Sequence, residues 1–437
     1  MSRENKITVF GGLGGLICGI DFGIIAVAVP YIRALGLYSD SEIGWIVGGV
    51  MLGGIIASVC GGFLCDRLGR RSVVRLAAAC FLLSIPVICL SGTSFPVIIA
   101  GRILQGLSCG FLSVAVPLYL AETLPAERRG KGTAVFQLFL GIGLVLAALA
   151  GVVIARTLGA ADAGSDAVSA GAKSLAWRVN FWWTMLPGAL LAASSFSVPE
   201  SAGRAAAPSA GEARAADGEP LCSRRFVLPF LLALAVLTLN KLIGFGCVIP
   251  YAVMLLQKAG LSGALGNMGD LAVKVTNLVT TLAVVGLVDR LGRTRLMKIG
   301  TAGLTVALGL IGALFLAFER GWLAASPAAG AATLGAFVLL VFSYSFGPGV
   351  CVWLVLSELM PVRIRAKGMS VALLSNQFVA WGLASAFLPL ANAVGFGPLF
   401  FGFALFGALY FVTALFIPET KGLTMDEIET LFEKDRR

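Results

Sequence analysis

The stretch Asp66-Arg67-Leu68-Gly69-Arg70 ends one long apolar segment, and Asp289-Arg290-Leu291-Gly292-Arg293 ends another in the second part of the chain. Charged residues and glycine break apolar helices, so each copy marks a short loop at a helix end. A single copy of this pattern would be weak evidence for any fold. Two copies at matching places predict that the chain consists of two related halves.

A second motif repeats in the same order. Glu122 is followed seven positions later by Arg129, and Glu358 is followed seven positions later by Arg365. Internal duplication of this kind is typical of secondary transporters, in which two bundles of helices surround a central site. The repeats therefore predict a duplicated six-helix transporter fold.

The composition places the chain in a membrane. Of its 437 residues, 58% are hydrophobic and only 13% are charged, whereas a soluble domain carries about 25% charged residues. Apolar runs of roughly 20 residues, each long enough to cross a bilayer, recur from Ile7 to Ile417. These properties exclude a soluble enzyme, a nucleic-acid-binding protein and a secreted disulfide scaffold as descriptions of the whole chain.

Residue types that support metal or covalent chemistry are scarce. The chain has no histidine, which excludes His-based metal sites, catalytic triads and proton relays. Its 9 cysteines form no Cys-x-x-Cys pair and so indicate neither a zinc site nor a disulfide framework. We therefore expect no enzymatic activity, no metal and no cofactor.

Charged and turn-rich breaks divide the chain into twelve predicted transmembrane helices, six in each half, which makes it an all-α membrane protein. The predicted spans are 7–32, 42–64, 72–92, 95–121, 131–155, 179–198, 226–257, 264–288, 296–318, 330–357, 368–393 and 396–417. The predicted parts are a first half at 1–200, a linker at 201–225, a second half at 226–418 and a tail at 419–437. The small and polar segment 157–177 is expected to be a mobile surface loop.

The basic residues predict the orientation. Arg and Lys concentrate in alternate loops, and the opposite loops are nearly bare. Since excess positive charge stays in the cytoplasm, both termini are expected to be cytoplasmic. We expect Arg71, Arg75 and Arg363 to be solvated members of these loops.

Longer motifs show that the chain resembles the major facilitator superfamily and, within it, the sugar porter family. The matching stretches are Gly62–Arg71, Gly101–Gly110, Val116–Glu122, Arg129–Lys131, Pro199–Ser201, Gly347–Gly349 and Pro418–Gly422. The resemblance runs from about Gly11 to Glu429. It implies the major facilitator fold and alternating access to a sugar site between the halves.

The chain departs from the family in predicted helix 7. Family members read approximately Gln-Gln-x-x-Gly-x-Asn there, whereas this chain has Asn240, Lys241 and Gly246 at the three polar positions. The linker also looks too short for the latching helices that the family usually carries. The resemblance therefore implies the fold more firmly than the substrate.

Asp21 lies in the middle of the first predicted helix, where a charge costs roughly 2.5–3.5 kcal/mol on insertion scales. It is either a packing residue neutralised by a basic neighbour or a proton carrier. The resemblance favours the carrier, because proton-coupled sugar porters have Asp here, and it implies Arg102 as the partner. Contact with Arg102 favours the carboxylate, whereas burial without it favours the acid, so a cycle of making and breaking the pair would move one proton.

A sugar site needs polar side chains for the hydroxyls and an aromatic platform for the apolar face. By motif position, the resemblance implies the substrate-binding residues Gln137, Asn240, Lys241, Asn277, Trp353 and Asn376. Each amide alone could equally be an interhelical hydrogen bond, and Trp353 alone could be a packing residue. Their convergence on family positions favours a binding site.

Lys241 has three open interpretations. It could pair with Asp21, donate hydrogen bonds to a neutral sugar, or bind the carboxylate of a sugar acid such as a uronate or aldonate. Without a second buried cation to form a clamp, we favour the neutral sugar and keep the acid as the alternative.

The charges of the repeated motifs form a second predicted site, for gating. They could be solvated loop residues, but the resemblance implies ion pairs between helices that close the cytoplasmic side of the outward-open state. Each exposed pair is worth about 0–1 kcal/mol, although several together can bias a balanced equilibrium. The predicted gating residues are Asp66, Arg67, Arg70, Glu122, Arg129, Asp289, Arg290, Arg293, Glu358 and Arg365, with Tyr251 as a lid beside a bend at Gly244, Gly246 and Pro250.

The leading hypothesis is a proton-coupled importer of a hexose or pentose in a bacterial inner membrane. It would act as a monomer driven by the proton gradient, with sugar, protons and the lipid bilayer as partners and no nucleic acid. The alternatives are a facilitator, a carrier of a polyol or sugar acid, and, from another class, a membrane sugar sensor. A sensor would be expected to carry a longer cytoplasmic extension than the residues after Ile417.

Overall fold

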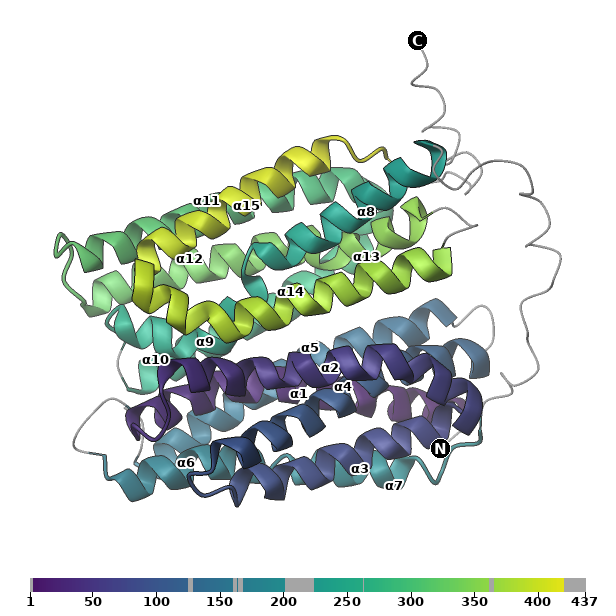
Figure 1. The fold of residues 1–437 in the computed structure, drawn as a ribbon, viewed down its shortest axis with the longest axis horizontal. Helices are drawn as coiled ribbons and strands as arrows, with labels where there is room; N and C mark the ends of the chain where they lie inside the picture. The colour runs from purple at the N-terminus through teal and green to yellow at the C-terminus, as the bar shows by residue number, and fades with distance from the viewer. Residues whose placement is uncertain are drawn as a thin grey trace, which may run out of the picture.

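The computed structural model describes residues 3–124, 129–159, 163, 168–200, 224–261, 263–360 and 365–419. These residues fold into α-helices joined by short turns, and they contain no β-strand. The helices form two bundles that lie side by side, the first half below and the second half above in Figure 1. The predicted all-α fold is confirmed.

The first bundle consists of α1 (Arg3–Ala34), α2 (Asp40–Leu68), α3 (Arg70–Cys89), α4 (Phe95–Thr123), α5 (Arg129–Thr157), α6 (Ala170–Trp182) and α7 (Met185–Ser194). The second consists of α8 (Arg224–Leu242), α9 (Phe245–Lys258), α10 (Ala264–Leu291), α11 (Arg293–Glu319), α12 (Pro327–Phe346), α13 (Pro348–Leu359), α14 (Arg365–Val394) and α15 (Phe396–Leu415). Helix α1 packs on α5, and α2 packs on α4, in the first bundle, while α11 packs on α15 in the second.

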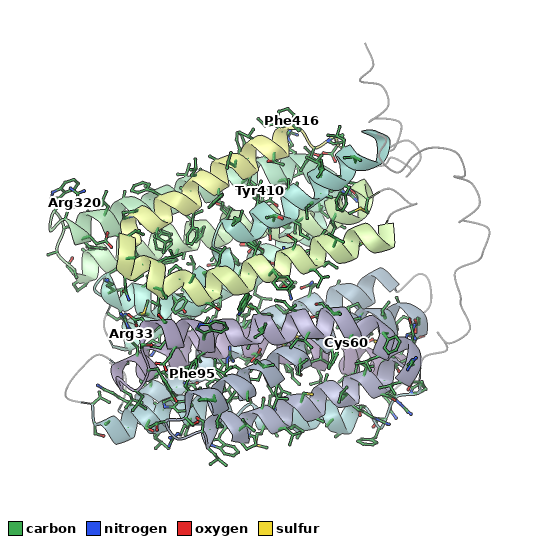
Figure 2. All side chains as sticks on the ribbon, in the orientation of Figure 1. Arg33, Cys60, Phe95, Arg320, Tyr410 and Phe416 are labelled. Carbon is green, nitrogen blue, oxygen red and sulfur yellow. The ribbon has the colours of Figure 1, made fainter. Side chains whose placement is uncertain are left out.

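In the described part of the chain, 11 helical segments are long and apolar enough to cross a bilayer, against the twelve predicted. The twelfth passage is the pair α6 and α7, which a turn at Trp183 and Thr184 divides into helices of 13 and 10 residues. Together they cover residues 170–194, about 35 Å of helix, which is enough for one crossing. Apolar side chains such as that of Phe416 project from the outer faces of the bundles, as lipid contact requires (Figure 2).

The predicted surface loop 157–177 is wrong over its last part. Helix α6 begins at Ala170, and Ser169 caps it by accepting a hydrogen bond from the amide of Ala172 at 3.2 Å. Lys173 and Trp177 are buried, and α6 packs against α1. Small and polar residues are equally compatible with a loop and with the first turn of a packed helix, so composition alone could not place this boundary.

Helices α8 and α9 form one membrane passage that breaks at Gly244. Its φ of +74° is left-handed, a conformation that residues with a Cβ rarely adopt. A Cβ on Gly244 would also lie 2.6 Å from the ring of Phe403. The predicted weak point of the span 226–257 is therefore present at Gly244.

The two ends of the bundles differ in the turns that they carry. The basic end carries the turns at Gly69, between α2 and α3, and at Gly292, between α10 and α11. The far end carries the turns between α1 and α2 and between α9 and α10. If the basic end is cytoplasmic, as the positive-inside rule predicts, the far end faces outward.

The halves meet along α2 and α14, α5 and α10, and α1 and α9. In the described part of the chain, side-chain hydrogen bonds across this seam lie at the far end or at mid-depth. They run from Arg33 to Met254, from Asn392 to Asp40, from Arg156 to Met268 and from Lys274 to the carbonyl of Gly23. Figure 2 shows Arg33 at the seam, so this conformation is one in which the halves are joined at the far end.

Candidate functional site

Asp21 on α1 and Arg102 on α4 meet in the interior of the first bundle. The Arg102 Nη1 atom lies 3.4 Å from Asp21 Oδ1, and the two side chains are 2% and 0% exposed. Glycine makes this packing possible, because a Cβ on Gly49 of α2 would lie 3.0 Å from the Cβ of Arg102. The structure therefore brings together the two predicted coupling residues, and their role in proton movement stays a prediction.

Arg102 has two nearer partners than Asp21. Its Nε donates to the carbonyl oxygen of Ile46 on α2 at 3.0 Å, and its Nη1 donates to Gln105 Oε1 at 2.6 Å. The guanidinium thus stays hydrogen-bonded when Asp21 moves away or takes up a proton. Sequence reasoning missed Gln105, although its position three residues after a buried arginine places it on the same face of the helix.

The second oxygen of Asp21 faces a thiol. Cys109 Sγ donates to Asp21 Oδ2 at 3.4 Å, and Cys18 Sγ donates to the carbonyl oxygen of Cys109 at 3.7 Å. Thiols are weak donors, so they hold a carboxylate less firmly than an amide or hydroxyl does. Asp21 consequently has one distant cation and one weak donor as its partners in this conformation.

Two of the predicted substrate residues, Asn240 and Lys241, lie beside the break between α8 and α9, close to Gly246. Asn240 is buried, its Oδ1 accepts from Tyr344 OH at 3.4 Å, and its Nδ2 has no partner among the described residues. Lys241 is half-buried and forms no ion pair with a described residue. Gly246 has open space around it, since a Cβ there would meet no atom within 4 Å. The break therefore combines unused hydrogen-bond donors with free volume.

Gln137 and Asn277 lie at the seam between α5 and α10. A Cβ on Gly141, one turn beyond Gln137, would lie 2.8 Å from the side chain of Leu278, the neighbour of Asn277. Gln137 is exposed, whereas Asn277 Nδ2 donates to Ser345 Oγ on α12 at 2.9 Å. This arrangement puts both amides where the two bundles face each other.

Trp353 and Asn376 differ in their surroundings. The Trp353 residue on α13 is 43% exposed, so its ring offers a free apolar face. Asn376 on α14 is buried, and its Nδ2 donates to the carbonyl oxygen of Leu237 on α8 at 2.9 Å. Asn376 thus already makes the interhelical hydrogen bond that was the alternative to sugar binding, and the substrate role of both residues stays a prediction.

Tyr251 lies on α9 and packs within the second half. Its hydroxyl donates to the carbonyl oxygen of Ala384 at 3.4 Å, and its ring stacks on Phe387 with centroids 4.8 Å apart. Helix α9 itself packs against α1 of the first half. A lid role for Tyr251 therefore requires α9 to move as a unit, and it stays a prediction.

The repeated motifs form two matching clusters at the basic end. Arg70 contacts Glu122 at 3.0 Å and Asp66 at 3.2 Å, and Arg293 contacts Glu358 at 3.3 Å. Each of these ion pairs joins helices of one half. Arg67 lies over the ring of Phe63 at 4.3 Å, Arg290 is exposed, and the side chains of Arg129, Asp289 and Arg365 lie outside the described part of the structure. The gating role of the whole set stays a prediction.

The prediction that Arg71 and Arg75 are solvated is wrong. Arg71 Nη1 donates to the carbonyl oxygen of Val198 at 3.0 Å, and Arg75 donates to the hydroxyl and the carbonyl oxygen of Ser195, each at 3.2 Å. Both arginines lie on α3, and their hydrogen bonds hold the residues after α7 against that helix. Arg363, the third residue of that prediction, lies outside the described residues.

Two glutamates cap helices at the basic end. Glu200 accepts a hydrogen bond from the amide of Arg71 at 2.9 Å, and Glu419 accepts from the amides of Arg293 and Thr294 at 3.1 and 3.2 Å. A carboxylate at a helix N-terminus satisfies free amides and complements the helix dipole. The end of each half is thus fastened to its own repeated motif, a function that the sequence motifs alone did not reveal.

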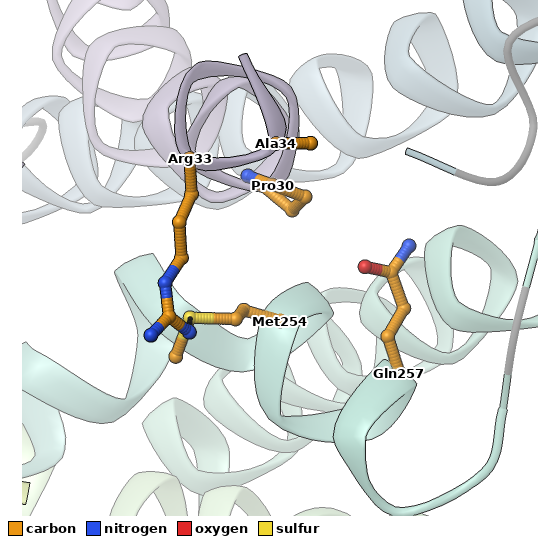
Figure 3. Close-up of a pocket in the computed structure, with 5 residues that line it drawn as sticks. All are labelled: Pro30, Arg33, Ala34, Met254 and Gln257. Atoms are coloured by element: carbon orange, nitrogen blue, oxygen red, sulfur yellow. Dashed lines mark hydrogen bonds between the residues drawn. The ribbon is translucent and has the colours of Figure 1, made fainter. Parts of the chain in front are cut away.

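A polar cluster at the far end was also missed. Arg33 and Asp40 form an ion pair at 2.9 Å, and Asn392 Nδ2 donates to Asp40 Oδ2 at 2.6 Å across the seam. Beside it, Figure 3 shows Arg33 reaching from α1 to Met254 of α9, next to a cavity of about 210 Å³. These contacts close the far end in this conformation.

Asp270 and Lys274 on α10 form a second buried ion pair that sequence reasoning passed over. Lys274 Nζ lies 2.6 Å from Asp270 Oδ2, and the side chains are 2% and 0% exposed. The signal was available, because two opposite charges four residues apart in an apolar span face the same side of a helix.

Known proteins resemble this chain over nearly its whole length. A family model described as "Sugar (and other) transporter" matches residues 7–203 and 205–432. A glucose transport protein of Synechocystis sp. is 29% identical over 456 residues, which cover 97% of this chain and 96% of the relative. D-xylose-proton symporter-like 2 of Arabidopsis thaliana is 30% identical over 465 residues, which cover 96% of this chain and 89% of the relative. The crystal structure of a D-xylose-proton symporter matches 97% of this chain and 100% of its own with a TM-score of 0.83 and 24% identity, which confirms the predicted major facilitator fold.

Proposed function

The chain belongs to the sugar (and other) transporter family, and on that premise we propose that it imports a monosaccharide together with a proton. It is a multi-pass membrane protein. The proposed cycle alternates between conformations open at the far end and open at the basic end, with the sugar bound between the halves. The proton gradient drives this cycle, and no cofactor takes part.

The observation that supports proton coupling is the loosely held Asp21 carboxylate. A buried charge this far inside a membrane protein is costly unless it is paired, yet Arg102 approaches it only to 3.4 Å. The guanidinium donates shorter hydrogen bonds to Gln105 Oε1 and to the carbonyl oxygen of Ile46. Asp21 can therefore take up a proton without leaving the guanidinium unpartnered, as a proton carrier requires.

Coupling follows from the helices that hold these groups. Asp21 is on α1, which packs on α9 across the seam, whereas Arg102 also bonds α2, which packs on α14. Movement of the halves shifts α1 relative to α2 and so changes the distance between Asp21 and Arg102. Close contact favours release of the proton, and separation favours its uptake.

The substrate proposed is a neutral hexose or pentose. Lys241 donates but cannot accept, and Asn240 has an unused donor. Other predicted ligands lie on helices at the same interior: Trp353 on α13, which packs on α8, and Gln137 and Asn277 on α5 and α10, which pack on each other. Arg102, rather than Lys241, is the cation that pairs with Asp21 here. This geometry favours the two interpretations in which Lys241 meets the substrate.

A sugar acid is the second candidate, because Lys241 has no anionic partner among the described residues. A uronate or aldonate carboxylate would supply that partner. With a neutral sugar, Lys241 would donate hydrogen bonds to hydroxyl groups. With a sugar acid, it would neutralise the carboxylate.

The proposed setting is a cell inner membrane, with both termini and the basic end in the cytoplasm and the monomer as the functional unit. The clusters of Arg and Lys at the basic end support this orientation.

The test is uptake by proteoliposomes offered hexoses, pentoses, polyols and uronic acids, with and without an imposed proton gradient. We expect gradient-stimulated uptake of a neutral monosaccharide, retained at reduced affinity in Lys241→Gln. Uronate uptake by the parent that disappears in Lys241→Gln would replace the neutral sugar by the acid. An uptake rate and final sugar concentration that are the same with and without the proton gradient would identify a facilitator.

A further inference from the structure

The proposed cycle leaves one buried group of charges without a role. Asp270 and Lys274 lie one turn apart on α10, fully inside the membrane passage, with 2.6 Å between Oδ2 and Nζ. Neither residue belongs to the coupling pair, to the predicted sugar site or to the clusters at the basic end. Asn277, a predicted sugar ligand, lies one turn further along the same helix face.

Lys274 extends this pair across the seam. Its Nζ donates to the carbonyl oxygen of Gly23 on α1 at 3.1 Å. A backbone carbonyl has two lone pairs, so this oxygen can accept from lysine as well as within its own helix. Gly23 lies two residues from Asp21, so the group fastens the second half to the helix segment that carries the proposed proton carrier. We call Asp270, Lys274 and the Gly23 carbonyl the mid-depth bridge.

The bridge is not explained by packing alone. Well-packed apolar residues can often replace a buried ion pair without loss of stability. Asp270 Oδ1 also has no hydrogen-bond partner among the described residues, whereas permanent buried polar groups are normally satisfied. An incompletely satisfied charge at a moving seam is expected of a contact that forms in one conformation and opens in another.

The other contacts across the seam support the same interpretation. The hydrogen bonds of Arg33, Asn392 and Arg156 lie towards the far end, on partly exposed side chains. The bond from Lys274 is the buried member of this set, at mid-depth. Opening of the far end separates α1 from α9 and α10, and it therefore has to break the bridge.

We propose that Lys274, held in place by Asp270, is a latch that stabilises the conformation closed at the far end by bonding α1 beside Asp21. This proposal rests on the transport cycle proposed above. Asp270 holds the ammonium in place and aimed at α1, and Lys274 supplies the bond that crosses the seam. A hydrogen bond from a charged donor shifts a two-state equilibrium by about 10- to 100-fold, enough to set which end is open.

The test measures amide hydrogen exchange by mass spectrometry on the purified full-length protein, without any substrate. Lys274→Met keeps the length of the side chain and removes its donors. If the latch operates, exchange rises at the far end, in residues 34–40 and 254–261, and falls at the basic end, in residues 66–72 and 288–294. The far-end rate should rise about 10-fold or more where opening limits exchange.

Two further variants separate the latch from a loss of packing. Lys274→Arg retains a charged donor and should restore at least half of the shift, and Asp270→Asn should reproduce part of it. The matched control is Arg156→Gln, which removes an exposed bond across the same seam and should move exchange much less. If Lys274→Met fails to fold, the opposite shifts at the two ends must appear in Asp270→Asn.

Faster exchange at both ends, or unchanged exchange at both ends, would overturn the latch. A second measurement, protons carried per sugar, should be the same in Asp270→Asn as in the parent. A lower ratio in this variant would make Asp270 a second proton carrier and also overturn the proposal. Because the exchange measurement needs neither sugar nor proton gradient, its result is separate from the success or failure of the proposed function.

Discussion

Replacement of Asp21 by Asn removes the carboxylate that pairs with Arg102 and leaves the rest of its surroundings in place. The amide keeps the size of the protonated acid but cannot release a proton. Removing the sole partner of a buried charge costs about 3–5 kcal/mol. Here Arg102 retains the Ile46 carbonyl at 3.0 Å and Gln105 Oε1 at 2.6 Å. We therefore expect Asp21→Asn to fold and to bind sugar.

The expected size of the effect follows from one proton per sugar. A proton gradient equivalent to 100 mV supplies about 2.3 kcal/mol per charge. Since each 1.36 kcal/mol corresponds to a factor of ten, the parent can concentrate sugar up to about 50-fold. Asp21→Asn has no carrier for the proton, so its accumulation ratio should remain near one.

The assay is uptake of radiolabelled monosaccharide into proteoliposomes with an imposed gradient of known size. Exchange of labelled for unlabelled sugar without a gradient shows whether each variant is folded and cycles. Glu42→Gln, which alters a carboxylate that caps α2, is the matched control and should accumulate sugar as the parent does. Accumulation by Asp21→Asn to more than a few-fold would refute the assignment of Asp21 as the coupling residue.

Three further predictions concern neighbouring side chains. In Gln105→Leu, Arg102 loses its 2.6 Å acceptor and should hold the Asp21 carboxylate more firmly, so the pH of half-maximal uptake should fall; an unchanged pH profile would argue against this competition. Charge reversal in Glu122→Arg should lower the maximal rate more than sugar affinity, and an equal loss of binding would contradict a gating role. Glu419→Ala removes the cap of α11 and should destabilise the protein by about 0.5–2 kcal/mol in a thermal melt, whereas an unchanged melting temperature would show that the cap is dispensable.

The fold could be predicted from the sequence because its main determinants are local. Apolar length defines a membrane passage, and charged turns such as that at Asp66–Arg70 define where it ends. The errors occur where a tertiary contact decides the outcome. Ala170–Trp177 becomes helical because it packs on α1. The division of α6 from α7 at Trp183 and Thr184 does have a local signal, since Pro187 follows closely and cannot donate a helical hydrogen bond to the Trp183 carbonyl.

The candidate site was predictable only in part. Asp21 and Arg102 are charged residues within apolar spans, and such residues can be recognised in the sequence as candidates for a functional site. Asp270 and Lys274 carry the same signal, as opposite charges four residues apart in an apolar span. Gln105 differs, because its role follows only from its contact with the guanidinium of Arg102. Arg71 shows the reverse case, since an arginine predicted to be a solvated loop residue lies in α3 and donates a hydrogen bond to the residues after α7. Contacts between distant segments are set by packing, and the sequence shows only the residues that could take part.

The most direct test of coupling through Asp21 is the proton movement that sugar itself causes. Proteoliposomes in a weakly buffered medium receive the transported monosaccharide with no imposed gradient, and the external pH and sugar uptake are recorded together. Coupling through Asp21 predicts a rise in external pH equivalent to about one proton for each sugar taken up, and no pH change with Asp21→Asn while sugar still enters. Sugar entry into the parent without any pH change, or an undiminished pH change in Asp21→Asn, would contradict it.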